Sequence, residues 1–288
     1  MHPSLGVGLE LPAHPIALDP GAPGTSREDL VRAVRAAGAA GVDMIWFDGT
    51  PPRAGAPRAE AVTMAAGASV ADGRVGLGVR LTLADGRHPA VVARELTALD
   101  LMSGGRAVLA LCSGSPGPDD GPGRLAEAVA ICHGLFGGGP MGVTGRHYRV
   151  AGAVNRPGPR QPGGPPIVVE LGPDEPADAL EPCLDQVAAW MTGGDEAAVA
   201  ARRRSLDGLA GGPVTLLWRG PLDGGDTEVG DRARRLVDAG ADGVVLVSTG
   251  WVVDGADDRR PPDPGPLVRA LRPPAAEPAE PGLSEPPR

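Results

Sequence analysis

Few residues of this sequence stand in patterns that perform covalent or metal chemistry. No Gly-x-Ser-x-Gly segment marks a serine nucleophile, and no phosphate-binding P-loop is present. The five histidines never occur at the i, i+4 spacing with which two of them bind one metal ion. The three cysteines are odd in number and far apart, so they form neither a disulfide framework nor a Cys-x-x-Cys site. We therefore predict that the protein has no metal centre.

Tryptophan is the most distinctive side chain, because the chain has four tryptophans but only two phenylalanines and one tyrosine. The tryptophans, which fall in or just after segments predicted below to be strands, are Trp46, Trp190, Trp218 and Trp251. Indole groups at strand ends can line an apolar pocket for a flat ring, but large aromatic side chains are also buried for packing alone. Both interpretations stay open. On the first, Trp46, Trp190, Trp218 and Tyr148 line a substrate pocket.

The overall composition limits the classes of partner. The chain carries 27 basic and 36 acidic residues, a net charge of −9, which gives no electrostatic footprint for nucleic acid or anionic membranes. No run of about 18 apolar residues could span a bilayer, and the N-terminus lacks the pattern of a signal peptide. We predict a cytoplasmic protein with reduced cysteines that binds neither nucleic acid nor membranes.

Short apolar segments alternate with longer amphipathic ones, which favours a parallel sheet with helices outside it. The predicted strands are 5–11, 42–47, 75–83, 107–111, 166–171, 185–190, 213–218 and 243–247. The predicted helices are one from Ser26 to Gly41, then 58–71, one from Pro89 to Gly104, 124–136, 195–209 and 227–239. Segment 143–150 interrupts this order and is predicted to form a hairpin arm, and 266–271 to begin a closing helix.

Eight strands with a helix after nearly every one predict the α/β class and a single (β/α)8 TIM barrel, a fold that needs about 250 residues. We assign residues 1–271 to this barrel. Residues 272–288 are mostly Pro, Ala and Glu, so they cannot offset their ordering entropy and are predicted to form a disordered tail. Barrel active sites lie at the C-terminal ends of the strands, which is where candidate residues are sought.

The segment 87–111 resembles the signature of the luciferase-like monooxygenases. The matching groups are His88-Pro89, Ala93-Arg94-Glu95, Leu99-Asp100 and Ser103-Gly104-Gly105-Arg106. Two further segments match in the same order, 38–46 at the second strand and 145–169 at the arm and the start of the fifth strand. The resemblance covers about residues 1–250 and weakens after the fifth strand.

This resemblance implies an oxidoreductase that uses FMN or the deazaflavin F420 and transfers hydride to a small organic substrate, in some relatives with oxygen as acceptor. The Gly, Ala, Pro and Arg bias is typical of an actinobacterial genome and supports F420 only weakly. The resemblance places the ring beside the third and fourth strand ends. The residues expected there are Arg80, Thr82, Cys112, Ser113 and Gly114. A tight turn without a ligand would also favour Ser and Gly at the fourth strand end.

Other strand ends depart from the family pattern. Many relatives carry a histidine after the second strand, where this chain has Thr50. Asp48 is then the only nearby carboxylate. Both Asp48 and Thr50 are expected to face the substrate. After the fifth strand, Gly172 remains for phosphate binding, but Glu170 adds negative charge and Pro173 lacks an N–H donor.

These departures leave a second hypothesis open, a cofactor-free barrel that acts as a binding or accessory subunit. In the first hypothesis the phosphate end binds Ser248, Thr249 and Gly250 after the last strand. A homodimer or pairing with a paralogous barrel is expected from the relatives.

Three signature and charge features are expected to be structural. His88 is expected to cap a helix, and Arg106 to form a salt bridge with Asp100 or Glu95. Residues 202–204, three arginines, are expected on a solvated helix face, with phosphate binding as the alternative.

Overall fold

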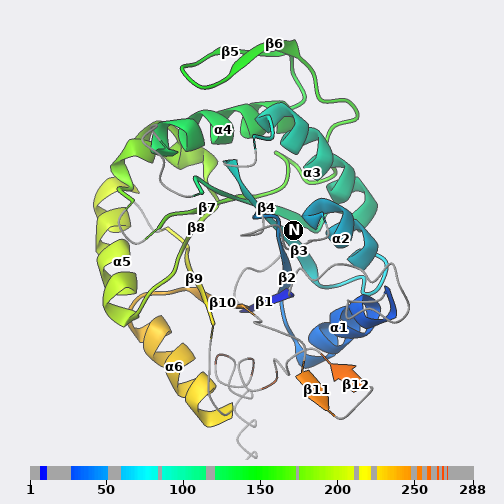
Figure 1. Cartoon of the computed structure of the whole chain (residues 1–288). Helices are drawn as coiled ribbons and strands as arrows, with labels where there is room; N and C mark the ends of the chain where they lie inside the picture. Colours follow the sequence, from blue (N-terminus) through cyan, green and yellow to red (C-terminus); the bar gives the residue numbers. More distant parts are fainter. Residues whose placement is uncertain are drawn as a thin grey trace, which may run out of the picture.

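Eight parallel strands close into a barrel in a computed structural model of the chain (Figure 1). The structure describes residues 7–11, 27–50, 60–83, 86–114, 121–172, 175–210, 214–221, 226–247, 252–254 and 258–260, together with 265, 268 and 271. The order around the barrel is β1-β10-β9-β8-β7-β4-β3-β2. Their bounds are β1 (Val7–Leu11), β2 (Met44–Asp48), β3 (Gly76–Thr82), β4 (Ala107–Cys112), β7 (Ile167–Glu170), β8 (Ala189–Thr192), β9 (Leu216–Gly220) and β10 (Gly243–Val247).

Helices surround this barrel and alternate with its strands along the chain (Figure 1). They are α1 (Arg27–Ala40), α2 (Ala61–Ala68), α3 (Pro89–Ser103), α4 (Gly121–Phe136), α5 (Glu196–Ala210) and α6 (Asp226–Asp238), with a 3-10 helix at Asp178–Gln186 between β7 and β8. The predicted (β/α)8 barrel is therefore confirmed. The proposed tail, 272–288, lies outside the described residues.

The predicted insertion arm is also confirmed, as an antiparallel hairpin of β5 (Met141–Thr144) and β6 (Arg149–Ala153) that lies outside the barrel beside α4 (Figure 1). The Glu127 side chain on α4 accepts hydrogen bonds from the backbone N–H groups of Arg146, His147 and Tyr148 in the hairpin turn. A carboxylate held by three N–H donors fixes the arm to the helix layer. A second antiparallel pair joins β11 (Val252–Asp254) to β12 (Asp258–Arg260).

Local sequence explains where α3 begins and ends. The His88 side chain accepts a hydrogen bond from the Ala90 N–H at 3.2 Å, which confirms the predicted cap, and Pro89 occupies the first turn. Gly104 ends the helix in the left-handed conformation, at a φ of 75°.

Two predicted strands are displaced toward the C-terminus. The sixth was expected at 185–190, but β8 begins at Ala189, because the polar residues Asp185 and Gln186 belong to the end of the 3-10 helix. The seventh was expected at 213–218, whereas β9 extends to Gly220 and so includes Arg219.

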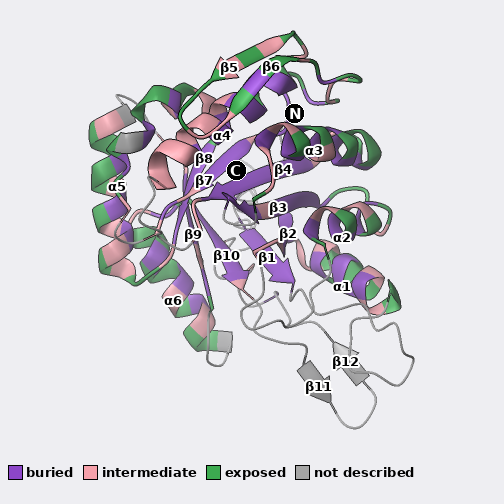
Figure 2. Ribbon diagram, turned by 45° about the horizontal axis from the view of Figure 1, so that its top comes forward, coloured by how far each residue is buried: buried purple, intermediate pink, exposed green. Residues whose placement is uncertain are grey.

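The barrel wall is largely buried and carries one apolar layer on each of its two faces (Figure 2). One cluster consists only of strand residues and fills the lumen: Met44, Trp46, Val108, Ala110, Val168, Ala189, Met191, Leu217 and Val245. The other cluster joins the outer face of the strands to the helices. Trp46 is the largest lumen side chain, and two glycines make room for it. A Cβ atom on Gly78 would lie 2.3 Å from the indole ring, and one on Gly8 would lie 2.8 Å from its Nε1.

The lumen tryptophan carries a polar group without a partner, which yields a prediction. Trp46 Nε1 is buried with no hydrogen-bond partner among the described residues, whereas Trp218 Nε1 donates to the Gly194 carbonyl at 2.8 Å. Removing a partnered donor gives up a hydrogen bond, whose net contribution to stability is about 1 kcal/mol. We expect Trp218→Phe to lower the free energy of unfolding by about 1 kcal/mol more than Trp46→Phe does, as measured by urea denaturation. Equal losses would contradict this assignment.

Candidate active site at the mouth of the barrel

Five charged side chains fill the lumen at the C-terminal ends of the strands. This mouth cluster consists of Glu10 on β1, Asp48 on β2, Arg80 on β3, Glu170 on β7 and Arg219 on β9. Its side chains are between 6% and 18% exposed. Because side chains alternate across a strand, each lies two positions beyond a residue directed into the lumen, such as Trp46 or Leu217. The layer above the apolar lumen is therefore ionic.

Two arginines hold the mouth cluster together. Arg80 donates to both carboxylate oxygens of Glu170, to the Asp48 carboxylate at 2.8 Å and to the Thr50 hydroxyl. Arg219 donates through Nε and Nη2 to Glu10, each at 2.7 Å, and lies 3.7 Å from Glu170 and 3.9 Å from Asp48. The bidentate geometry fixes both guanidinium planes.

The environment separates the pKa values of two mouth carboxyl groups. Burial acts to raise the pKa of Asp48, but Arg80, the hydroxyl and N–H of Thr50, and Arg219 outweigh it, so this pKa lies below its usual value. Burial is the largest influence on Glu10 and raises its pKa, although Arg219 acts in the opposite direction. Asp48 is therefore held ionised, whereas the pKa of Glu10 shifts in the opposite direction.

The predicted residues at the ends of β3 and β4 lie beside this cluster. Thr82 is opposite Cys112 in the strand register, and Cys112 lies opposite Glu170 on its other side. Burial is the main reason that the pKa of the Cys112 thiol is raised, to about 11, so the thiol is neutral at physiological pH. The structure thus brings together Asp48, Thr50, Arg80, Thr82 and Cys112.

The end of β7 differs from the expectation. Glu170 was expected to place a negative charge near a phosphate, and in the structure it is paired with the arginines of the mouth cluster. The carboxylate beside Gly172 is that of Glu175, which accepts from the Gly172 N–H at 2.7 Å and from the Ser113 hydroxyl. Arg202 was expected on a solvated face; it is instead 7% exposed and donates to the carbonyls of Gly172 and Glu175.

Other candidate residues lie away from the mouth or outside the described chain. Trp190 and Trp218 belong to the layer between strands and helices, on the opposite face of the barrel wall from Trp46. Their positions match the packing interpretation. Tyr148 meets His88 edge to face, with ring centroids 5.4 Å apart, at the start of α3. Residues 248–251, which include Ser248, Thr249 and Gly250, are not among the described residues.

Sequence reasoning missed Glu10, Arg219 and Glu175. Glu10 and Arg219 could have been found from the sequence. Each is a charged residue near the end of an apolar strand, and each lies two positions after a residue that faces the lumen. Arg219 was overlooked because the predicted strand stopped at Trp218. Glu175 could not have been found, because only the folded turn brings its carboxylate to Gly172.

The opposite end of the barrel is structural. Arg106 was expected to pair with Asp100 or Glu95, but this is wrong: it donates to the backbone carbonyls of Ser69, Asp72, Val75 and Ser103. These carbonyls lie at the C-terminal ends of α2 and α3 or just before β3. Carbonyls at helix ends have no partner within their own helix, and the guanidinium supplies hydrogen-bond donors there.

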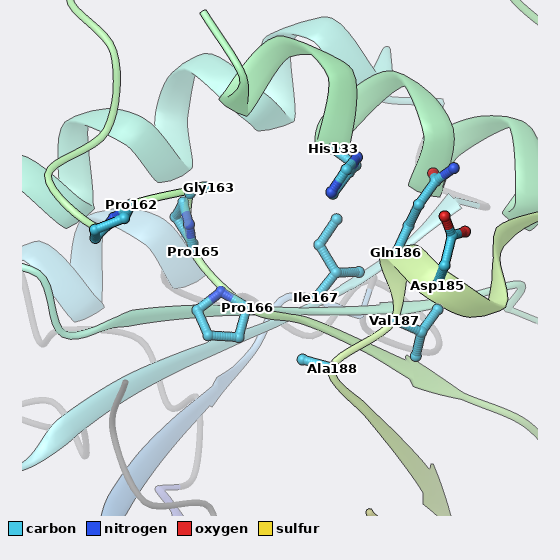
Figure 3. Close-up of a pocket in the computed structure, with 11 residues that line it drawn as sticks. His133, Pro162, Gly163, Pro165, Pro166, Ile167, Asp185, Gln186, Val187 and Ala188 are labelled. Atoms are coloured by element: carbon cyan, nitrogen blue, oxygen red, sulfur yellow. The ribbon is translucent and has the colours of Figure 1, made fainter. Parts of the chain in front are cut away.

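A pocket of about 410 Å³ lies at this same end (Figure 3). It is lined by His133, residues 162–167 before and at the start of β7, and residues 185–188 before β8. The pocket is thus remote in the fold from the mouth cluster. No group of three or more metal-binding side chains occurs within the described residues, and none of the helices described there is long and apolar enough to cross a membrane.

Comparison with known proteins relates this architecture to a family. Residues 12–210 match the family described as luciferase-like monooxygenase. A subunit of the pristinamycin IIA synthase of Streptomyces pristinaespiralis is 30% identical over 228 residues, which cover 72% of this chain and 79% of that protein.

Two solved structures share the fold. The coenzyme F420-dependent tetrahydromethanopterin reductase of Methanopyrus kandleri matches with a TM-score of 0.70 at 13% identity, over 86% of this chain and 94% of that one. The FMN complex of the oxygenating constituent of 3,6-diketocamphane monooxygenase, from a Pseudomonas putida plasmid, matches with a TM-score of 0.65 at 13% identity, over 94% and 96%. Because the family match spans more than half of the sequence, the chain belongs to the luciferase-like monooxygenase family.

Proposed function

We propose that this protein is a flavin- or F420-dependent oxidoreductase that acts on a small organic substrate at the mouth of the barrel. The observation that carries this proposal is the mouth cluster. Five largely buried charges are costly in a lumen that apolar side chains fill one layer below. A barrel that served only as a scaffold would gain stability from aliphatic residues at these positions, so the cluster supports catalysis over the cofactor-free alternative.

The chemistry of the donor set suits the ring of such a cofactor. Arg80 and Arg219, with their paired carboxylates, place fixed charges at the mouth, and charges placed near a flavin ring tune its electronics. The neutral Cys112 thiol would border the ring without adding charge. When bound, the cofactor would supply the hydride that passes between its ring and the substrate.

The protein's own residues would position the substrate and the charges around it. Asp48 is oriented by Arg80 and by the Thr50 hydroxyl, which donates to it at 2.6 Å, so it serves as a fixed acceptor facing the substrate. Glu10 accepts from two nitrogens of Arg219, each at 2.7 Å, so it would fix the orientation of that guanidinium beside the cofactor.

Titration with FMN and, separately, with F420 tests this proposal. Binding is followed by cofactor and tryptophan fluorescence. We expect one of the two cofactors to bind saturably with a micromolar dissociation constant. Arg219→Met should weaken that binding about tenfold, because one charge-assisted interaction with the ring is lost. Arg235→Met is the matched control, since Arg235 pairs with Glu196 on the surface and is 58% exposed. Absence of binding for both cofactors at high micromolar concentration would contradict the proposal.

The chain is similar to one subunit of a synthase, which supports a second proposal. We propose that this chain works together with another subunit. Light scattering of the purified protein, alone and with a co-expressed paralogous barrel, would separate a homodimer from a mixed pair.

A further inference from the structure

Two hydrogen-bond donors converge where β4 and β7 end. The Ser113 hydroxyl follows β4 and the Gly172 N–H follows β7, and these strands are neighbours in the barrel. The Glu175 carboxylate bridges them: Oε1 accepts from Ser113, and Oε2 accepts from Gly172 at 2.7 Å. We call the two donors the exit cradle. Because they already hold a carboxylate, their geometry suits an anion.

A turn and a buried arginine preorganise the exit cradle. The Glu175 N–H donates to the Gly172 carbonyl at 3.2 Å, and the Glu175 carboxylate accepts from the Gly172 N–H. Arg202 donates to the carbonyls of Gly172 and Glu175, at 2.7 and 2.8 Å, and thereby holds both ends of this turn. Since Arg202 is only 7% exposed, it also places a poorly solvated positive charge below the cradle.

We propose that Glu175 is a built-in anion that closes the exit cradle, and that a phosphoryl group binds there only when this carboxylate is absent or displaced. A phosphoryl oxygen requires the same N–H and O–H donors, so the two anions exclude each other. The inference rests on the proposed function for the identity of the ligand, the phosphate end of the cofactor. The proposal implies that in the wild-type protein the cofactor is bound through its ring, and that its phosphate adds no affinity at the exit cradle.

The test compares FMN with riboflavin, which has the same ring but no phosphate. In the wild-type protein we expect the two dissociation constants to agree within about threefold, because Glu175 occupies the cradle. In Glu175→Ala we expect FMN to bind at least about tenfold more tightly than riboflavin, the usual effect of charge-assisted hydrogen bonds to a freed donor pair. Riboflavin affinity should stay unchanged.

A control variant and a ring-free probe keep the outcome interpretable. Glu181→Ala removes the same charge from the exposed side of the following 3-10 helix and should leave the FMN preference at its wild-type value. Inorganic phosphate should raise the melting temperature of Glu175→Ala but not of the wild type, which tests the cradle even if neither flavin binds. If neither flavin binds, the proposed function fails, and the test of the exit cradle is then the effect of inorganic phosphate on the melting temperature.

Glu175→Gln guards against a folding defect, because it keeps the shape of the side chain and removes its charge. We expect it to shift the FMN preference and the phosphate response in the same direction as Glu175→Ala, by a smaller factor. Unchanged discrimination between FMN and riboflavin, with no phosphate response, in folded Glu175→Ala or Glu175→Gln would overturn the proposal. An equal gain in Glu181→Ala would overturn it as well, since the effect would then be one of general charge.

Discussion

Replacing Arg80 with methionine is expected to lower the free energy of unfolding at pH 7 by about 3–5 kcal/mol, the usual effect of removing one partner from a buried ion pair. Arg80 donates to Glu170, Asp48 and Thr50 at once. Methionine fills similar volume but leaves two largely buried carboxylates without their main counter-charge. Urea denaturation monitored by tryptophan fluorescence would measure the loss.

The same variant should show a distinctive pH dependence. In the wild type the folded-state pKa of Asp48 is lowered, mainly because Arg80 and Thr50 outweigh the effect of burial, so its ionised form contributes stability that is lost only as pH falls through that lowered pKa. Without Arg80 the effect of burial dominates, and the folded-state pKa rises above the unfolded one. Protonation then replaces the missing cation, so the difference from wild type should shrink as pH falls from 7 to about 5.

Arg87→Met provides the matched control for Arg80. Arg87 also pairs with two carboxylates, Glu95 at 3.0 Å and Glu60 at 3.3 Å, but these partners are 36% and 42% exposed. Such surface pairs contribute about 1 kcal/mol or less. If Arg80→Met lost no more stability than Arg87→Met, the mouth cluster would be well solvated, and the argument that its burial indicates function would lose its basis.

The barrel itself was predictable because its signals are local and repeated. Alternating strand and helix patterns fixed the number of units, and strong end signals such as His88-Pro89 and Gly104 located α3 to within a residue. Segments without such signals were placed less well. The 3-10 helix before β8 contains Pro182, and its polar end was assigned to the strand that follows.

The candidate site was less predictable, because the residues that carry the family resemblance largely build the other end of the barrel. Arg106 binds carbonyls there, and Asp100 and Gln161 bind each other. At the mouth we expected departures from the family pattern, so matching motifs could suggest where to look but not which side chains meet. The pairing of Arg219 with Glu10 joins residues 209 positions apart, and only closure of the barrel brings them together.

The two ends of the barrel therefore differ in what their charges do. At the lower end, charged groups bind backbone N–H and carbonyl groups, which fixes how strands and helices meet. The five charges of the mouth cluster mainly bind one another across the lumen, with Thr50 as a further partner. Ion pairs of this kind contribute little net stability when they are largely buried, which is why we propose a functional role for the mouth cluster and not for the Arg106 end.

Asp100→Ala should test the structural end with an effect as large as that of Arg80→Met. Asp100 is fully buried near the end of α3 and accepts from the N–H groups of Arg160 and Gln161, at 2.7 and 2.9 Å, and from the Gln161 side-chain amide at 2.7 Å. The same amide donates to the Ala107 carbonyl at the start of β4. Alanine leaves buried donors unpaired at about 1–3 kcal/mol each, so we expect a loss of roughly 4 kcal/mol in the free energy of unfolding.

Two further variants separate this network from a general effect of removing charge. Asp100→Asn keeps one carbonyl oxygen for the Gln161 amide but presents an NH2 group to the backbone donors, so its loss should be intermediate. Asp207→Ala removes a carboxylate that is 54% exposed and 3.8 Å from Arg203, and should cost about 0.5 kcal/mol or less. Cofactor affinity per folded molecule should be unchanged in Asp100→Asn, because the network lies at the opposite end of the barrel from the mouth cluster. A selective loss of cofactor binding in that variant would show that the two ends are coupled.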